Sequence, residues 1–152
     1  MIVRFKKSGR YLDVAPLIRL LGHSLRAHYQ EASWPAAIIP VPLHWRKLQQ
    51  RGFNQAALIA QSLARITPCP VRYNTVKRTK TISQQGLSAR QRNRNVRGTF
   101  KLVKPLDCTH VALVDDVMTT GSTLEELCRL LKRNGVLSVD VWCLARAQAH
   151  TS

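Results

Sequence analysis

The stretch VALVDDVMTTGST, residues 111–123, decides the fold of this chain. Its first four residues, 111–114, are apolar and predict a short buried strand. Asp115 and Asp116 stand at the carboxyl end of that strand, and small hydroxyl residues with one glycine lead into an amphipathic helix. Backbone N–H groups, hydroxyls and the partial positive charge of a helix amino terminus favour an anion. The stretch therefore predicts an anion-binding loop between a strand and a helix.

The segments around this stretch alternate between strand and helix patterns. Apolar residues at helical spacing predict helices over about 13–30, from an Asn54 cap to before Thr67, and over about 122–134. Apolar runs predict strands at 36–41, 71–76, 99–103, 111–114 and 138–144. Such alternation is typical of βαβ units and predicts an α/β fold, with a central mainly parallel sheet flanked by helices in one domain over residues 1–152.

Capping residues refine the ends of these helices. Asp13 is the expected N-cap of the first helix. Ser122 with Glu125, and Thr123 with Glu126, have the spacing of a capping box at the start of the last helix. Gly135 suits the position after that helix.

Two further segments carry basic residues near the expected ligand end of the sheet. Ligands bind at the carboxyl ends of the strands in such sheets, so the basic turn containing Arg46 and Arg51 should converge there with the two carboxylates. Residues 77–98 show few apolar positions and no stable period, which predicts a mobile flap, with a short helix possible near 88–95. The alternative is a loop without a function.

The charge is strongly unbalanced. The net charge is +16, and the range 32–106 contains fourteen basic residues and no acidic one. This pattern is typical of proteins with a polyanionic partner, although a solvated basic surface that aids solubility is the alternative. No apolar run approaches a membrane span and no signal peptide is evident, so we expect a cytoplasmic protein without membrane insertion. The four cysteines lack zinc-binding spacing and are expected to be buried free thiols.

The combination of groups suggests a sugar phosphate as ligand. Two adjacent carboxylates can accept hydrogen bonds from ribose hydroxyls or hold Mg²⁺, and the following loop can surround a phosphate. A separate basic turn can bind a pyrophosphate. The sequences GxxxxGK[ST] and GxGxxG are both absent, which argues against a P-loop NTPase and a dinucleotide-binding fold.

The stretch 111–123 resembles the phosphoribosyl-pyrophosphate (PRPP) signature of type I phosphoribosyltransferases. Together with VPLHWRKLQQRGFNQ, which begins at Val41, and QQGLSARQRNRNV, which begins at Gln84, it makes the chain similar to the ComF/GntX family over about residues 2–146. The resemblance implies a type I phosphoribosyltransferase-like fold with a flexible flap or hood.

The resemblance also implies roles for residues and a cofactor. Asp115 and Asp116 would bind the ribose hydroxyls of PRPP as the catalytic pair, with Mg²⁺ as cofactor. The 5′-phosphate would be bound by Thr119, Thr120, Gly121, Ser122 and Thr123. The pyrophosphate would be bound by Pro42, Leu43, Arg46 and Arg51. The flap would contribute Arg78, Lys80, Gln84, Arg90 and Arg94.

The chain departs from related proteins in two ways. ComF relatives typically begin with a cysteine-rich zinc-binding segment, which does not precede MIVRFKKSGR here, so we expect no metal site built from protein ligands alone. Enzymes of 6-oxopurine salvage usually carry an aspartate base where this chain has Thr119. The acceptor therefore stays open.

Three functions stay open, and the resemblance implies a context of DNA uptake in competence or of DNA utilisation for them. The first is phosphoribosyl transfer from PRPP to an unidentified acceptor. The second is a non-catalytic module that binds single-stranded DNA, or a helicase or DNA-uptake protein. The third joins the two: a PRPP-binding fold that serves as a sensor or scaffold without catalysis.

Overall fold

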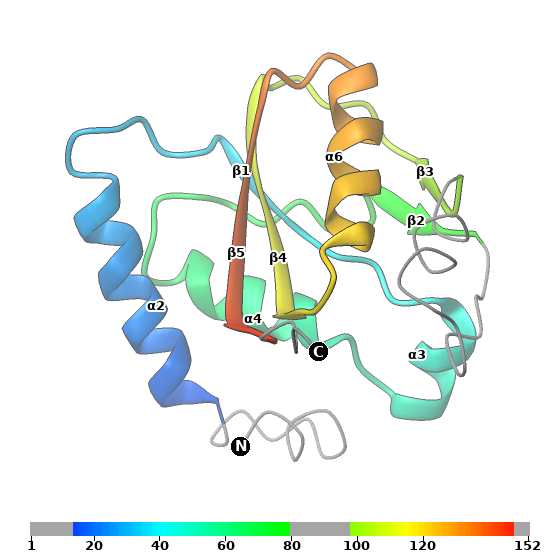
Figure 1. The fold of residues 1–152 in the computed structure, drawn as a ribbon, viewed down its shortest axis with the longest axis horizontal. Helices are drawn as coiled ribbons and strands as arrows, with labels where there is room; N and C mark the ends of the chain where they lie inside the picture. Colours follow the sequence, from blue (N-terminus) through cyan, green and yellow to red (C-terminus); the bar gives the residue numbers. More distant parts are fainter. Residues whose placement is uncertain (1–13, 80–97, 148–152) are drawn as a thin grey trace, which may run out of the picture.

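The computed structural model describes residues 14–79 and 98–147 (Figure 1). The possible helix over 88–95 lies outside these ranges. The elements follow in the order α2 (Ala15–His28), β1 (Ala37–Pro40), α3 (Trp45–Arg51), α4 (Gln55–Ala64), β2 (Val76–Arg78), β3 (Phe100–Leu102), β4 (His110–Met118), α6 (Ser122–Arg133) and β5 (Ser138–Arg146).

Within residues 14–79 and 98–147, the central sheet has three parallel strands in the order β1–β4–β5. In the register, Leu113 of β4 pairs with Ile39 of β1 and with Val141 of β5. All four residues of β1 are buried, as are residues 111–114 of β4. Strands of parallel sheets are commonly covered on both faces, which is why these segments are continuous apolar runs. The predicted parallel sheet flanked by helices is confirmed.

Alternate residues of β4 face two different hydrophobic clusters. Ala112 and Val114 pack with α2 and α4, whereas Val111 and Leu113 pack with α6 and with the β2–β3 pair. Figure 1 shows α2 on one side of the sheet and α6 on the other. Both faces of β4 are thus held, and the carboxyl end of this strand is placed between two packed layers.

The small antiparallel pair of β2 and β3 was predicted only in part. The strand predicted over 71–76 is wrong: Val71 makes an isolated bridge to Ile38, and the chain then turns through Asn74, whose φ is 56°. The strand begins instead at Val76 and pairs with β3, for example Lys77 with Lys101. The flap predicted over 77–98 therefore begins inside a strand.

Strands β4 and β5 are longer than predicted. The expected strand over 111–114 continues to Met118, and β5 continues to Arg146, with Asp115 paired to Cys143 and Met118 paired to Arg146. Hydrophobic periodicity locates the buried part of a strand, while the backbone ladder can continue where side chains become polar. The two carboxylates consequently lie within β4 and not after it.

The structure contradicts the predictions at two of the four helix ends for which a cap was predicted. The N-cap of α2 is Val14, so the cap assigned to Asp13 is wrong. The N-cap of α6 is Gly121, without a side-chain cap bond, so both predicted capping boxes are wrong. Asn54 does cap α4, accepting a hydrogen bond from the Ala56 N–H at 3.1 Å, and Gly135 has the expected positive φ of 94° after α6.

Helix α3 was not predicted, since its segment was interpreted as a basic turn. None of its seven residues is buried, so it lacks the apolar stripe that identifies a helix in a sequence. None of the helices in the described ranges combines the length and the apolar character that crossing a bilayer requires.

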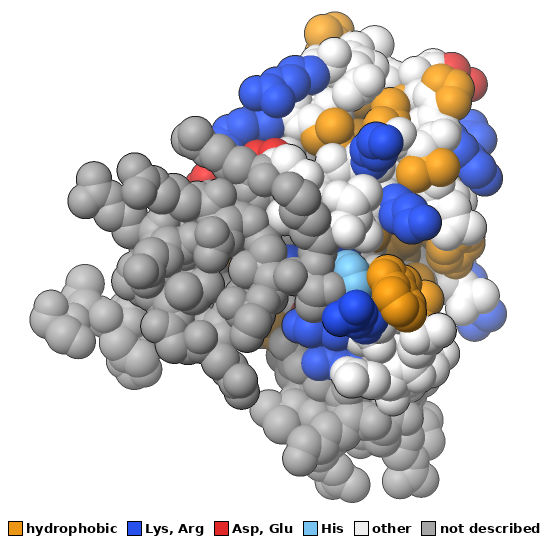
Figure 2. Space-filling model, turned by 90° about the vertical axis from the view of Figure 1, so that its right-hand side faces the viewer, with side chains coloured by type: hydrophobic (Ala, Val, Ile, Leu, Met, Phe, Trp, Pro, Cys, Tyr) orange, Lys and Arg blue, Asp and Glu red, His pale blue; other side chains and the backbone are white. Residues whose placement is uncertain are grey.

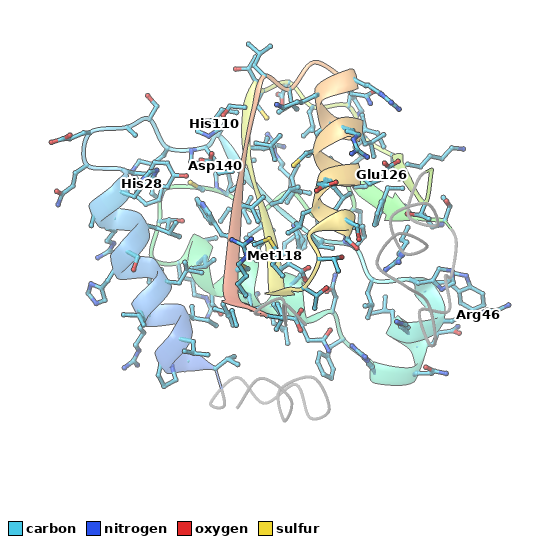
Figure 3. The ribbon with its side chains drawn as sticks, in the orientation of Figure 1. His28, Arg46, His110, Met118, Glu126 and Asp140 are labelled. Atoms are coloured by element: carbon cyan, nitrogen blue, oxygen red, sulfur yellow. The ribbon has the colours of Figure 1, made fainter. Side chains whose placement is uncertain are left out.

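A polar cluster begins at the amino ends of β4 and β5 and extends to Trp142 in the middle of β5. Asp140 of β5 accepts a hydrogen bond from the Tyr29 hydroxyl, and its Oδ2 lies 2.9 Å from Nε2 of His110. The indole N–H of Trp142 donates to the Tyr29 hydroxyl at 3.3 Å. This Asp140 cluster (Tyr29, His110, Asp140 and Trp142) joins the end of α2 to two strands, and Figure 3 shows His110 and Asp140 far along the sheet from Met118.

Candidate functional site

The two carboxylates lie at the carboxyl end of β4. As successive strand residues they project to opposite faces of the sheet, Asp115 partly exposed and Asp116 9% exposed. The N–H of Asp116 donates to Oδ1 of Asp115 at 2.9 Å, and the N–H of Val117 donates to Oδ1 of Asp116 at 2.8 Å. These bonds to the main chain fix the orientation of both carboxylates.

The loop after β4 surrounds a small cavity of about 50 Å³. It is lined by Asp115, Met118, Leu124 and the loop residues 119–123. The structure thus brings together all five predicted phosphate-binding residues and one of the two carboxylates. The first turn of α6 adds hydrogen-bond donors. The N–H of Glu125 donates to the carbonyl of Gly121 at 2.9 Å. The N–H groups that precede it in the chain have no acceptor within the helix, as is general at a helix amino terminus. The cavity is suited to a small anion.

Gly121 is the residue that makes this loop possible. Its φ is 78°, in the left-handed region where a side chain is unfavourable, and it positions the start of α6. We expect Gly121→Ala to lower the free energy of unfolding by about 1–2 kcal/mol and to abolish binding of ribose 5-phosphate in calorimetry. Gly135→Ala is the matched control, because φ is also positive there but the site is at the other end of α6. Equal phosphate binding by both variants would contradict this role of the loop.

The four predicted pyrophosphate-binding residues lie in two different elements, the turn after β1 and helix α3. The N–H of Val41 donates to the carbonyl of Val114 at 2.9 Å, so the turn that contains Pro42 and Leu43 begins beside the carboxylates. Arg46 and Arg51 lie on α3 and are exposed. In Figure 3, Arg46 lies at the outer edge of the molecule, away from Met118 at the end of β4. Pro42 and Leu43 line a cavity of about 440 Å³ together with Arg78, and neither lines the small cavity of loop 119–123. The guanidinium group of Arg46 is directed away from the end of β4, where both carboxylates lie (Figure 3).

Arg78 is a basic residue whose charge interacts with the carboxylate of Asp115. It lies on β2, partly buried, with its guanidinium carbon 5.5 Å from the centroid of the Phe100 ring. Burial lowers the pKa of Arg78, and the charge of Asp115 opposes this shift. The buried Nε of Arg78 has no hydrogen-bond partner among the described residues. The other predicted flap residues, Lys80, Gln84, Arg90 and Arg94, lie outside the described ranges.

His44 connects the turn after β1 to α3. It is 3% exposed, and its Nδ1 accepts a hydrogen bond from the Arg46 N–H at 3.2 Å as the N-cap of α3. Burial, with the positive charges of Arg78, Arg46 and Lys47, lowers the pKa of His44 below its ordinary value of 6.5. The imidazole is therefore neutral at pH 7, with Nδ1 available to accept.

This cap gives a pH-dependent prediction. Since the pKa of His44 is lower in the folded chain than in the unfolded chain, the cap is complete above pH 6.5 and is lost as the pH falls through the lowered folded value. We expect faster amide hydrogen exchange at Arg46 as the pH is lowered from 7.5 to 5, after correction for intrinsic rates. His44→Asn should keep a cap at every pH. The same pH profile in both proteins would show that His44 does not control the helix end.

The described residues contain no group of three His, Cys, Asp or Glu side chains arranged to hold a metal ion. The four cysteines are free, and burial raises the pKa of each thiol: Cys69, Cys108, Cys128 and Cys143. The thiols are free as expected, whereas the expected burial is confirmed for Cys69 alone among the four, since the other three are partly buried.

One charged residue near the loop was missed from the sequence. Arg146 pairs in register with Met118 and lines a cavity of about 440 Å³ with Thr119, Thr120 and Lys132. It lies beyond the predicted end of β5 at residue 144, where the apolar pattern has already stopped. The register with β4, which sets its position, is not visible in one sequence.

The comparisons with known proteins agree with this geometry. The model of the phosphoribosyl transferase domain matches residues 49–152. The chain is 43% identical to Competence protein F of Haemophilus influenzae, over 97% of this chain and 67% of that protein. It is 47% identical to DNA utilization protein YhgH of Escherichia coli K12, over 74% of this chain and 50% of that protein. The chain thus spans half to two thirds of the length of these relatives.

Solved structures are similar in fold. The purine phosphoribosyltransferase from Pyrococcus horikoshii superposes with a TM-score of 0.52 at 20% identity, over 90% of this chain and 74% of that one. At this identity the likeness concerns the fold alone. The sheet, the loop at the end of β4 and the two closely similar proteins lead to one conclusion: this chain belongs to the ComF family and has the type I phosphoribosyltransferase fold.

Proposed function

We propose that this chain binds PRPP together with Mg²⁺ at the carboxyl end of β4 and acts as a phosphoribosyltransferase-type protein in DNA uptake or DNA utilisation. One observation carries the proposal: Asp115 lines the same small cavity as loop 119–123, which begins α6. A carboxylate beside a phosphate-sized loop suits a ribose that carries a phosphate, because the hydroxyls need acceptors and the phosphate needs donors.

Each group has a defined task in this proposal. Asp115 and Asp116 accept hydrogen bonds from the ribose hydroxyls, and the main-chain bonds to their Oδ1 atoms keep them oriented. Loop 119–123 donates to the 5′-phosphate. Arg78 supplies positive charge on the Phe100 side of the site, where a pyrophosphate leaving from the turn after β1 would be stabilised.

The two carboxylates fit Mg²⁺ only when PRPP supplies further oxygen ligands. Asp115 and Asp116 provide carboxylates, and Mg²⁺ is usually bound by one or two carboxylates together with substrate phosphates. When bound, the ion would neutralise the negative charge of the departing pyrophosphate. The carboxylates would keep the ribose hydroxyls in place during that step.

The acceptor is not a purine of the salvage type in this proposal. Thr119 is exposed at the position where a carboxylate base would be needed, and residues 119–123 contain no acidic side chain. An acceptor that needs no proton removed by this loop is expected.

Calorimetry and pyrophosphate release test the proposal in two steps. We expect PRPP to bind the chain with Mg²⁺ and far more weakly in the presence of EDTA. We then expect pyrophosphate release, measured with a coupled assay, when the correct nitrogen acceptor is added. Absence of PRPP binding would contradict the proposal, whereas binding without release for any tested acceptor would favour a non-catalytic role.

A second candidate function is a cytoplasmic, non-catalytic module that contacts single-stranded DNA, or a helicase or DNA-uptake protein. Two observations favour it. The relatives carry the names Competence protein F and DNA utilization protein, and the range 32–106 has fourteen basic residues and no acidic one. Binding of a polyanion through such a surface weakens steeply with salt.

A further inference from the structure

A second cavity lies apart from the phosphate loop. We name it the α3–β2 groove; it measures about 440 Å³ and shares no lining residue with the cavity at the end of β4. Three residues of the proposed pyrophosphate site, Pro42, Leu43 and Arg78, also line the groove. Its walls come from the end of β1 and the turn after it, α3, the start of α4, the turn before β2, β2 itself and the residue after β3. This volume falls within the roughly 300–1,000 Å³ of ordinary small-molecule pockets.

The groove gathers exposed apolar side chains. Seven large apolar side chains are exposed among the described residues, and four of them line this groove: Trp45 (50% exposed), Leu48 (42%), Tyr73 (44%) and Val103 (55%). Scattered exposed apolar residues need no explanation, whereas a contiguous group of them commonly marks a binding surface. Two of the four are aromatic rings, which offer flat faces for stacking.

The rim of the groove is positively charged. The guanidinium carbon of Arg46 lies 5.4 Å from the centroid of the Trp45 ring, and Lys77 lines the groove from β2. No acidic residue occurs anywhere in the range 32–106, which contains the whole lining. Figure 2 shows basic side chains beside exposed apolar ones on this side of the molecule, with acidic side chains at its margins. The occupant should therefore be negatively charged and aromatic.

We propose that the α3–β2 groove binds unstacked bases of a single-stranded nucleic acid. Trp45 and Tyr73 stack on bases, while Arg46 and Lys77 contact phosphates along the strand. Aromatic side chains within a basic groove are the usual means of binding single strands without sequence preference. A duplex keeps its bases stacked on each other and presents only phosphates. An acidic peptide would satisfy the charges but leaves the ring faces without stacking partners. This inference rests on the second candidate function. Because Pro42, Leu43 and Arg78 belong both to this groove and to the proposed pyrophosphate site, the variants that test it are made at Trp45, Tyr73 and Lys77, which have no task in the proposed PRPP complex.

Fluorescence anisotropy with three labelled probes of equal length tests the inference: oligothymidylate, an abasic oligonucleotide and a duplex. We expect the full chain to bind oligothymidylate at least 10-fold more tightly than the abasic strand, as one or more stacked bases imply. Trp45→Ala with Tyr73→Ala should remove most of this difference and leave abasic binding almost unchanged. Trp45→Phe with Tyr73→Phe should retain it, because the rings are kept.

The charge on the rim is tested separately. Lys77→Gln should weaken both single-stranded probes and reduce the slope of log affinity against log salt by about one. Arg19→Gln and Leu20→Ala are matched controls, since both residues are exposed on α2, across the sheet from α3. Neither control should alter binding.

Three outcomes would overturn the inference. One is equal affinity of the double alanine variant and the unaltered chain for oligothymidylate. Another is equal affinity of the unaltered chain for oligothymidylate and for the abasic strand, which would show that charge alone drives binding. The third is tighter binding of a polyglutamate peptide with interspersed aromatics, which would indicate a protein partner. PRPP calorimetry on the same variants reports on the fold and on the β4 site, so failure of the groove and failure of the proposed PRPP site are distinguishable.

Discussion

Replacing Asp115 and Asp116 together by asparagine is expected to lower the affinity for PRPP by at least 100-fold. Each carboxylate makes hydrogen bonds to ribose hydroxyls in the proposed complex, and hydrogen bonds to charged groups contribute about 1.5–3 kcal/mol each. Two such losses amount to roughly 3–6 kcal/mol, or two to four powers of ten in affinity. Calorimetric titration of PRPP with Mg²⁺ into the double variant measures this change.

The control for this experiment is Asp107→Asn, because Asp107 is a highly exposed carboxylate in a long 3.8 Å ion pair with Arg72. It removes one negative charge without altering β4. Asparagine also keeps the size of the side chains at 115 and 116, so the strand should remain paired with β1 and β5. An unchanged affinity in the double variant would refute the assignment of the ribose site.

Arg78→Met is expected to weaken PRPP binding by about 10- to 100-fold while leaving the free energy of unfolding unchanged or raised. The guanidinium is partly buried, its Nε has no partner among the described residues, and burial lowers its pKa. A buried, incompletely bonded charge is costly, and an apolar chain of similar length removes that cost. The loss of binding follows from the loss of a cation close to Asp115. Urea denaturation and calorimetry together measure the two effects.

Lys77→Met serves as the control, since Lys77 is the preceding residue of β2 and is exposed. It removes the same charge from the same strand and should leave PRPP affinity within about twofold. A loss of several kcal/mol of stability in Arg78→Met would instead mean that Arg78 holds the fold together through Asp115, as expected when one partner of a buried pair is removed.

The parts of the fold that could be predicted are those with a strong apolar pattern. Residues 111–114 and 36–41 are continuous apolar runs and form the buried centre of the sheet, and α4 and α6 show helical spacing with buried Ile59 and Leu127. Where side chains are polar, the pattern ends before the element does. The carboxylates therefore lie inside β4, although the sequence places them after a strand.

The errors have separate physical causes. Helix α3 buries no side chain and depends on the His44 cap, a residue that is seldom considered as a cap. At α6 a glycine with positive φ provides the turn, so the hydroxyl residues are not needed as caps. Thr120 and Ser122 instead lie with their hydroxyl oxygens 3.0 Å apart. The role of Arg78 depends on the pairing of β2 with β3, which is not local in sequence.

The site was predictable where it is continuous in the chain. Asp115 and loop 119–123 follow each other and lie around one cavity. Two other parts reach this edge only through the pairing of strands. The hydrogen bond from Val41 to Val114 places the turn after β1, and the pairing with Met118 places Arg146. Arg46 lies away from the loop (Figure 3) because it is an exposed residue of α3, a helix that was not predicted from the sequence.

The Asp140 cluster has a consequence for how this fold can change during evolution. It anchors α2, β4 and β5 at the end of the sheet that has no part in the proposed chemistry. Stability and ligand choice are therefore assigned to opposite ends of the same strands. Substitutions in the loops at the carboxyl ends alter recognition without disturbing the anchor, as is usual for loops on a rigid scaffold. A family built on this sheet can acquire new ligands by changing loops and keep its folding intact.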